Sequence, residues 1–216
     1  LLRAVAIDPN NSDGLIALGL AQLQLKQVPK AIESLQKATK SAPKNLDAWA
    51  TLADVQFGQR DFKGALATLD AGLKAVGDQP VLLEKAVATS MMLNDPKLGI
   101  GYAERSLKVV PSYKQGWLNL AQLAMLAGDG DKSIAAARQL LTLDPTHWEA
   151  WFHLGNVYDA LPDEAKAIEA YQKALKSQPN NWRVLMNVAW TLLQEVDKAE
   201  WGEAKDLVDK ANAVTP

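Results

Sequence analysis

One stretch of the sequence, WFHLGNVY at 151–158, carries residue types that can do acid–base chemistry. His153 is one of two histidines in the 216-residue chain. Glu149 precedes it by about one helical turn, and Asn156 follows it by nearly one. A histidine beside an orienting carboxylate is a minimal pair for general acid–base catalysis. The same residue types also serve packing and recognition, so the rest of the chain must decide between these roles.

The other parts of a catalytic site are missing from the sequence. There is no cysteine, which removes thiolate nucleophiles, disulfides and cysteine-based metal sites. No glycine-rich phosphate loop is present, and Gly-Asp-Gly-Asp at 128–131 lacks the remainder of a calcium loop and predicts a turn. With only His147 and His153, a catalytic metal would need carboxylates to complete its ligands. We therefore expect no enzymatic activity, no cofactor and no metal, and a His153 that contacts a partner or solvent.

The composition excludes several kinds of partner. The chain has 23 basic and 25 acidic residues, a formal charge of −2, so it lacks the basic excess typical of nucleic-acid binding. No apolar run approaches the ~18 residues that a membrane span needs, so we expect no direct membrane insertion. Bacterial cytoplasm and periplasm are both compatible with a cysteine-free chain, and the localisation stays open.

A fixed period runs through the sequence. The prolines that mark it stand 34, 68, 34 and 34 residues apart, and they are Pro9, Pro43, Pro111, Pro145 and Pro179. Gly77 takes the place of the missing mark, and Pro216 follows after three extra residues. Between the marks, apolar residues recur at spacings of three and four, which predicts two helices in each unit. Each proline ends a second helix, because the residue before proline avoids the α region.

This period divides the chain into six repeats, preceded by residues 1–11 as the tail of an earlier one. The repeats are 12–45, 46–79, 80–113, 114–147, 148–181 and 182–216. We number the places in each repeat from its first residue. The fourth and seventh places are mostly large and apolar, whereas the eighth and twentieth are mostly small. Small residues at facing positions let two helices approach to about 8–10 Å.

The repeat at 148–181 resembles the tetratricopeptide repeat (TPR) family. The matching residues are Trp151, Leu154, Gly155, Tyr158, Ala167, Tyr171, Ala174 and Pro179. The resemblance covers essentially the whole chain, although repeats 80–113 and 182–216 are degenerate. It implies an all-α fold, a right-handed α-solenoid of stacked antiparallel helix pairs that forms a single array over 1–216. We expect this array to be part of a longer chain.

The resemblance also implies that the first helices line a concave groove that binds other proteins. The expected partner-binding residues are Phe57, Lys85, Met91, Met92, Leu118, Asn119, Gln122, Met125, Phe152, His153, Asn156, Arg183, Asn187 and Trp190. The apolar residues among them, above all methionine, can adapt to partners of different shape. The carboxamides can bind a peptide backbone whatever its sequence. The groove places hold six acidic and two basic residues, which favours a neutral or basic partner.

Two interpretations of function remain at this stage. The first is a non-catalytic scaffold that binds a peptide or helix of a partner protein in its concave groove. The second is a structural spacer, or an array that self-associates through uncapped terminal repeats, in a larger bacterial envelope, secretion or polysaccharide-export machine. The apolar patch around Met91, Met92, Met125 and Phe152 suits the first if it is exposed. It has no such role if it packs in the core or against neighbouring repeats.

Overall fold

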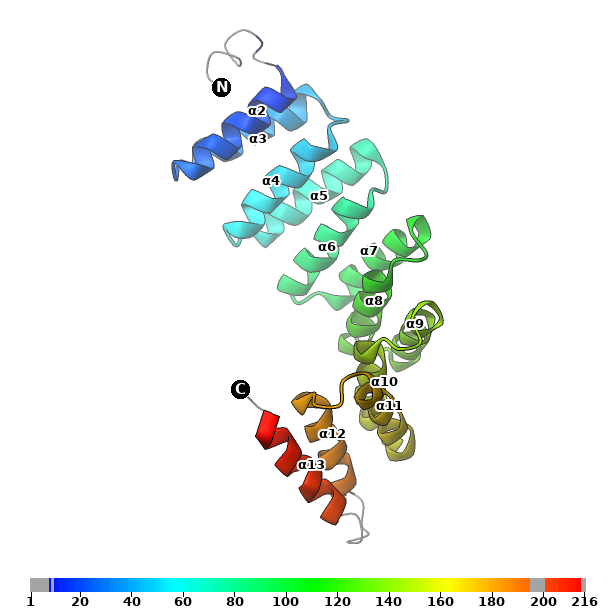
Figure 1. Ribbon diagram of the computed structural model, residues 1–216. Coiled ribbons are helices and arrows are strands. Elements are labelled where there is room, and N and C mark those ends of the chain that lie inside the picture. The colour runs from blue at the N-terminus through cyan, green and yellow to red at the C-terminus, as the bar shows by residue number, and fades with distance from the viewer. Residues whose placement is uncertain (1–7, 9, 195–200, 215–216) are drawn as a thin grey trace. The chain divides into compact units, whose positions relative to one another are not determined.

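The computed structural model describes residues 8, 10–194 and 201–214, and all the regular structure within them is α-helical (Figure 1). The helices are α2 (Ser12–Gln24), α3 (Val28–Ser41), α4 (Leu46–Gly58), α5 (Phe62–Val76), α6 (Pro80–Met92), α7 (Pro96–Val109), α8 (Lys114–Leu126), α9 (Gly130–Leu143), α10 (Trp148–Ala160), α11 (Glu164–Ser177), α12 (Trp182–Gln194) and α13 (Trp201–Val214). Consecutive helices pack in pairs, α2 with α3 through α12 with α13. The predicted all-α fold of stacked helix pairs is confirmed.

Local capping explains where the helices begin. Most second helices follow an aspartate whose carboxylate accepts a hydrogen bond from a backbone N–H in the first turn, as Asp61 does from Gly64 at 2.9 Å. Asparagine does the same before three of the first helices, as Asn11 does from Gly14 at 2.8 Å, whereas α6, α8 and α10 have no side-chain cap. Such caps satisfy N–H groups that have no partner within the helix. The first helices start at residues 12, 46, 80, 114, 148 and 182, where the 34-residue period begins each repeat.

Small residues allow the close approach within each pair. Ala31, Ala65 and Ala167, at the twentieth place, are fully buried. Gly19 and Gly155, at the eighth place, lie against Leu35 and Tyr171 of the following helix. A larger side chain at these places would push the two helices apart.

The chain divides into two compact units, residues 1–111 and residues 112–216. In the first unit, the first helices contact one another, α2 with α4 and α4 with α6. In the second unit, α8 contacts α10 in the same way. Each unit therefore has a face built from first helices, and this is the face on which the resemblance places partner binding.

Candidate functional site

In the first unit, the candidate site is a pocket between α4 and α6. Its volume is about 200 Å³, and Asp54, Phe57, Lys85 and Ala88 are among the residues that line it. Phe57 is half-buried and packs edge-on against Phe62, with ring centroids 5.1 Å apart. The pocket thus combines an aromatic wall with a charged rim, and both come from places predicted to bind a partner.

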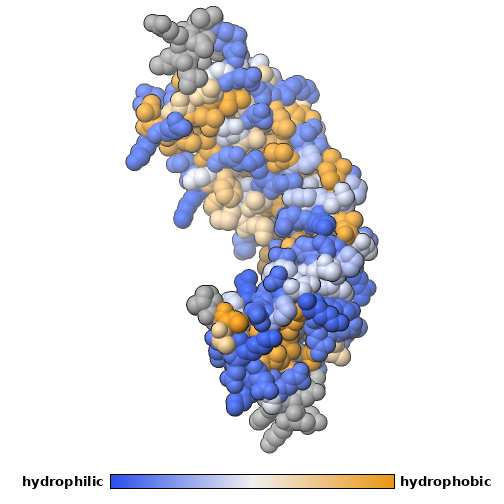
Figure 2. All heavy atoms as spheres, viewed as in Figure 1, coloured by the Kyte–Doolittle hydropathy of each residue, from blue (hydrophilic) through white to orange (hydrophobic). Residues whose placement is uncertain are grey.

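Two methionines extend this surface along α6. Met91 and Met92 have exposed fractions of 41% and 55%. Helical periodicity puts Met92 on the same side of α6 as Lys85 and Ala88. Figure 2 shows hydrophobic residues between hydrophilic ones on the viewed face of this unit. We call the surface formed by Phe57, Lys85, Ala88, Met91 and Met92 the α4–α6 face.

The charges on this side of the first unit are mostly negative. The Nζ of Lys85 lies 2.5 Å from Oδ1 of Asp54, in an ion pair that links α6 to α4. Since both groups are partly exposed, the ion pair adds little to the stability of the protein. It does balance the charge of Lys85, which is the one basic residue at a groove place of this unit. The other charged groove places are Asp13, Asp47 and Glu84. The groove places of this unit hold four acidic residues and one basic residue, a net charge of −3.

In the second unit, three of the four predicted carboxamides, Asn119, Asn156 and Asn187, bond to neighbouring side chains. The Asn156 Oδ1 accepts hydrogen bonds from the Tyr171 hydroxyl at 2.9 Å and from Asn187 Nδ2 at 2.8 Å. Burial raises the pKa of Tyr171 to about 12, so its hydroxyl stays protonated and remains a donor. Asn119 Oδ1 accepts from Gln115 Nε2 at 2.9 Å. Because both acceptor positions of the Asn156 oxygen are occupied, a partner has to use other groups of this network.

The remaining predicted residues of this unit lie on α8, α10 and α12. Phe152 is half-buried between Trp148 and Tyr171, with ring centroids 6.3 Å and 5.9 Å away. Gln122 and Met125 are partly exposed on α8, and Arg183 is exposed on α12. Trp190, also on α12, has an exposed fraction of 64%. These side chains are available to a partner.

Two predicted groove residues, Leu118 and His153, are wrong as contact residues because they are buried. Each has an exposed fraction of 6%. His153 Nε2 lies 2.8 Å from the hydroxyl of Ser133 on α9, and that hydroxyl donates to the Ala121 carbonyl at 2.8 Å. α8 contacts both α9 and α10, which leaves Leu118 without exposed surface.

Ser133 is the signal in the sequence that could have located His153 in the core. It occupies the twentieth place, where four of the six repeats have alanine when the three extra residues of the last repeat are allowed for. A hydroxyl at that buried place requires a hydrogen-bond partner, and a histidine on the neighbouring helix supplies one.

The geometry around His153 does not support the acid–base pair that its sequence context suggested. Glu149 lies 3.3 Å from Nδ1 of His147, so its carboxylate is directed to the other histidine. Ser133 is fully buried, and a substrate cannot reach its hydroxyl. In the part of the chain that the structure describes, no three histidine, cysteine or acidic side chains are grouped to hold a metal ion. No helix in that part has the length and apolar character needed to cross a membrane.

The burial of His153 predicts how the stability of the protein depends on pH. Burial lowers the pKa of His153, against a smaller opposing effect of the Ala121 carbonyl, so the neutral ring is favoured in the folded protein. In the unfolded chain the pKa returns to ~6.5, and the unfolded state binds more protons at lower pH. We therefore expect the free energy of unfolding, measured with urea, to be nearly constant between about pH 7.5 and 8.5 and to fall as the pH drops from about 6.5 to 5.

The control for this pH dependence is His153→Gln, which keeps a polar side chain but cannot titrate. Its free energy of unfolding should vary less over the same interval. An equal slope in both proteins would show that His153 is not the group responsible.

A repeated helix pair with a face of partly exposed apolar and amide side chains defines a helical-repeat scaffold. Tetratricopeptide repeat models match residues 27–88, 93–147 and 118–181, and the chain belongs to this family. Members of the family are generally non-catalytic protein-interaction scaffolds.

Solved structures with the same fold include three repeat proteins. The MamA protein superposes with a TM-score of 0.71 at 22% identity, over 79% of this chain and 92% of that one. YrrB, described as a TPR protein with an unusual peptide-binding site, has a TM-score of 0.72 at 18% identity, over 85% and 95%. A tetratricopeptide repeat protein from Parabacteroides merdae has a TM-score of 0.74 at 13% identity, over 95% and 80%. A comparison with curated proteins finds no match.

Proposed function

We propose that this chain is a protein-interaction scaffold whose first helices bind a peptide segment or a helix of a partner protein. The observation that carries the proposal is the α4–α6 face, where the half-buried Phe57 lines a pocket and α6 also exposes Met91 and Met92. Apolar side chains at a pocket release water when a partner covers them, and methionine adapts to partners of different shape. YrrB shares the fold and is described as having a peptide-binding site, which supports the same use here.

The partner segment for the α4–α6 face is neutral or basic. The predicted groove residues of the first unit include only one basic residue, Lys85, and it is already paired with Asp54. The acidic ones are Asp13, Asp47, Asp54 and Glu84. A basic segment would gain from this field, whereas an acidic one would be repelled. An amphipathic helix or an extended strand with an apolar anchor fits both the pocket and this charge.

The second unit offers a partner a more polar surface. Arg183 and the indole of Trp190 are exposed on α12, while Gln122 and Met125 are partly exposed on α8. Amide groups donate and accept, so they can bond to a peptide backbone without selecting side chains. Leu118 and His153 have no part in the proposal, because they are buried.

The test replaces exposed or partly exposed apolar side chains on one unit at a time. Met91→Ser with Met92→Ser changes the first unit, and Met125→Ser with Phe152→Ser changes the second. A partner isolated with the unaltered protein is titrated against each variant. Its Kd should rise about 10- to 100-fold for the unit whose face it contacts, because a few buried apolar anchors carry most binding energy.

The matched control is Leu98→Ser with Val109→Ser, which removes two exposed apolar side chains from α7 instead. This variant should bind as the unaltered protein does. Unchanged affinity in both test variants would contradict the proposal. Light scattering of the same samples tests the alternative of self-association, which requires a mass that rises with concentration.

A further inference from the structure

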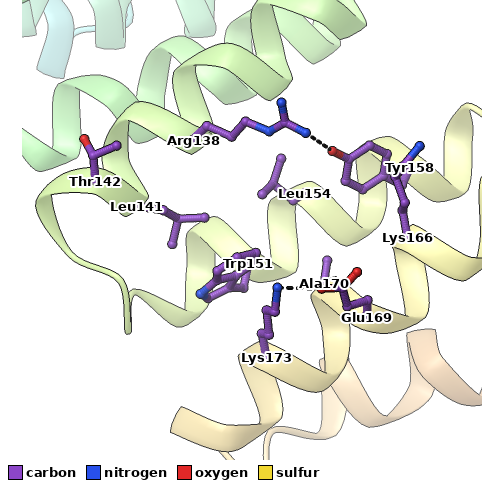
Figure 3. A pocket seen from close by; sticks show the side chains of 10 residues that line it. All are labelled: Arg138, Leu141, Thr142, Trp151, Leu154, Tyr158, Lys166, Glu169, Ala170 and Lys173. Atoms are coloured by element: carbon purple, nitrogen blue, oxygen red, sulfur yellow. Dashed lines mark hydrogen bonds and ion pairs between the residues drawn. The ribbon is translucent and has the colours of Figure 1, made fainter.

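A second and larger pocket lies away from the first-helix faces, in the second unit. It has a volume of about 490 Å³ and opens between α9 and α11, with α10 beneath (Figure 3). Leu154 and Trp151 of α10, Leu141 of α9 and Ala170 of α11 give it an apolar lining. Its volume is in the range of ligand-binding pockets.

The charged residues of this pocket are mainly basic. Arg138, Lys166 and Lys173 line it together with one acid, Glu169, so the lining carries a net charge of +2. Residues 112–216 contain ten basic and fourteen acidic residues, a net charge of −4. The pocket therefore collects positive charge within a unit of opposite sign, and an anion is the ligand that this arrangement favours.

The three cations differ in how far their charge is already balanced. Lys173 lies 2.6 Å from Glu169, and Lys166 lies 2.5 Å from Asp163. Arg138 donates instead to the hydroxyl of Tyr158, at 3.0 Å (Figure 3). A hydroxyl balances no charge, and a guanidinium has five N–H donors, so Arg138 can bind a carboxylate while it keeps this bond.

The corresponding place in the first unit shows why the pocket is open. Two repeat lengths, 68 residues, separate Tyr102 from Ala170 and Asp70 from Arg138. The Tyr102 ring is buried, and its hydroxyl donates to Asp70 at 2.6 Å. In that unit an aromatic ring fills the site, and the charge at the place of Arg138 is negative. In the second unit an alanine leaves the space free, and the charge is reversed.

We infer that the pocket between α9 and α11 binds an acidic peptide segment of a partner protein. A carboxylate of the segment bonds to Arg138, and an adjacent apolar side chain lies against Trp151 and Leu154. This site is independent of the proposed first-helix site, and it has the opposite charge preference. The scaffold thereby binds two chemically different segments on different sets of helices.

The experiment selects random nine-residue peptides, displayed on phage, against the unaltered protein and counter-selects them against Arg138→Gln. Enriched peptides should place Asp or Glu next to Leu, Phe or Trp. Their Kd, measured with the synthetic peptides, should rise roughly 10- to 100-fold in Arg138→Gln, as expected for loss of a charged hydrogen bond. The Kd should stay within about twofold of the original in Lys205→Gln, which removes one positive charge from an exposed position of the same unit, on α13.

Two further variants test whether the peptides bind in this pocket and not on the α4–α6 face. Ala170→Tyr introduces the residue that fills the corresponding site of the first unit, and it should abolish binding while circular dichroism shows the fold retained. Arg138 is exposed, so Arg138→Gln decides the question even if Ala170→Tyr does not fold.

Met91→Ser with Met92→Ser should leave the acidic peptides bound, which separates this site from the α4–α6 face. No enrichment, enrichment of neutral or basic peptides, or equal weakening by Lys205→Gln would overturn the inference.

Discussion

Replacing Gly155 with alanine is expected to destabilise the protein by about 2 kcal/mol, although alanine is the better helix former. Gly155 is buried in α10, and an added Cβ would overlap the Cδ1 and Cε1 atoms of the Tyr171 ring. Tyr171 is fully buried, and its hydroxyl is bonded to Asn156. The ring cannot move aside without losing this bond and its packing. Urea denaturation of both proteins measures the difference in the free energy of unfolding.

The matched control is Gly101 of α7, where an added Cβ meets nothing within 4 Å. Gly101→Ala should stabilise the protein by up to about 1 kcal/mol through helix propensity alone. In a Tyr171→Leu background the ring atoms are gone, so Gly155→Ala should be less harmful there. If the two glycine substitutions had the same effect, close packing on Tyr171 would not be the reason for Gly155.

The fold could be predicted from the sequence because its determinants are local and recur. Proline and glycine end the second helices, and Asp61 or Asn11 caps a helix within three residues of its own position. These signals need no knowledge of distant contacts, and they return every 34 residues. The helix starts accordingly coincide with the period.

The candidate site was less predictable, because exposure depends on contacts between repeats. Met91, Met92 and Trp190 are exposed where the resemblance places them. His153 occupies another of the predicted groove places and is buried, with its ring bonded to Ser133 of the preceding repeat. The position of a residue within its repeat does not show which side chain of an adjacent helix will contact it.

The pocket around Arg138 was missed for a related reason. It requires Arg138 on α9, Tyr158 on α10 and Ala170 on α11 at once, and these belong to two repeats. Reading only the first-helix places excludes two of these three residues. A comparison of second helices across repeats would have found the signal, since Arg138 and Ala170 replace Asp70 and Tyr102.

Truncating Leu82 to alanine is expected to destabilise the protein by about 3–4 kcal/mol. Leu82 is fully buried on α6, and its Cδ1 lies against Gly72 of α5. Because Gly72 has no side chain, it cannot fill the space that Leu82 leaves, so a cavity remains. The measurement is again the free energy of unfolding in urea. Leu126→Ala is the control, since Leu126 is 68% exposed and its truncation should change stability by less than about 0.5 kcal/mol.

Gly72 and Leu82 also test whether residue sizes are matched between successive repeats. In the unaltered protein, a Cβ at Gly72 would lie 3.1 Å from the Leu82 Cδ1 and 3.0 Å from the Trp49 Cβ, so Gly72→Ala alone should be destabilising. In the Leu82→Ala background the first contact is gone, and the pair becomes Ala–Ala, as Ala38 and Ala48 are at the preceding junction. The double variant should therefore be more stable than the sum of the single effects predicts. Simple additivity would mean that these two side chains do not share one space, and that Gly72 is required by Trp49 alone.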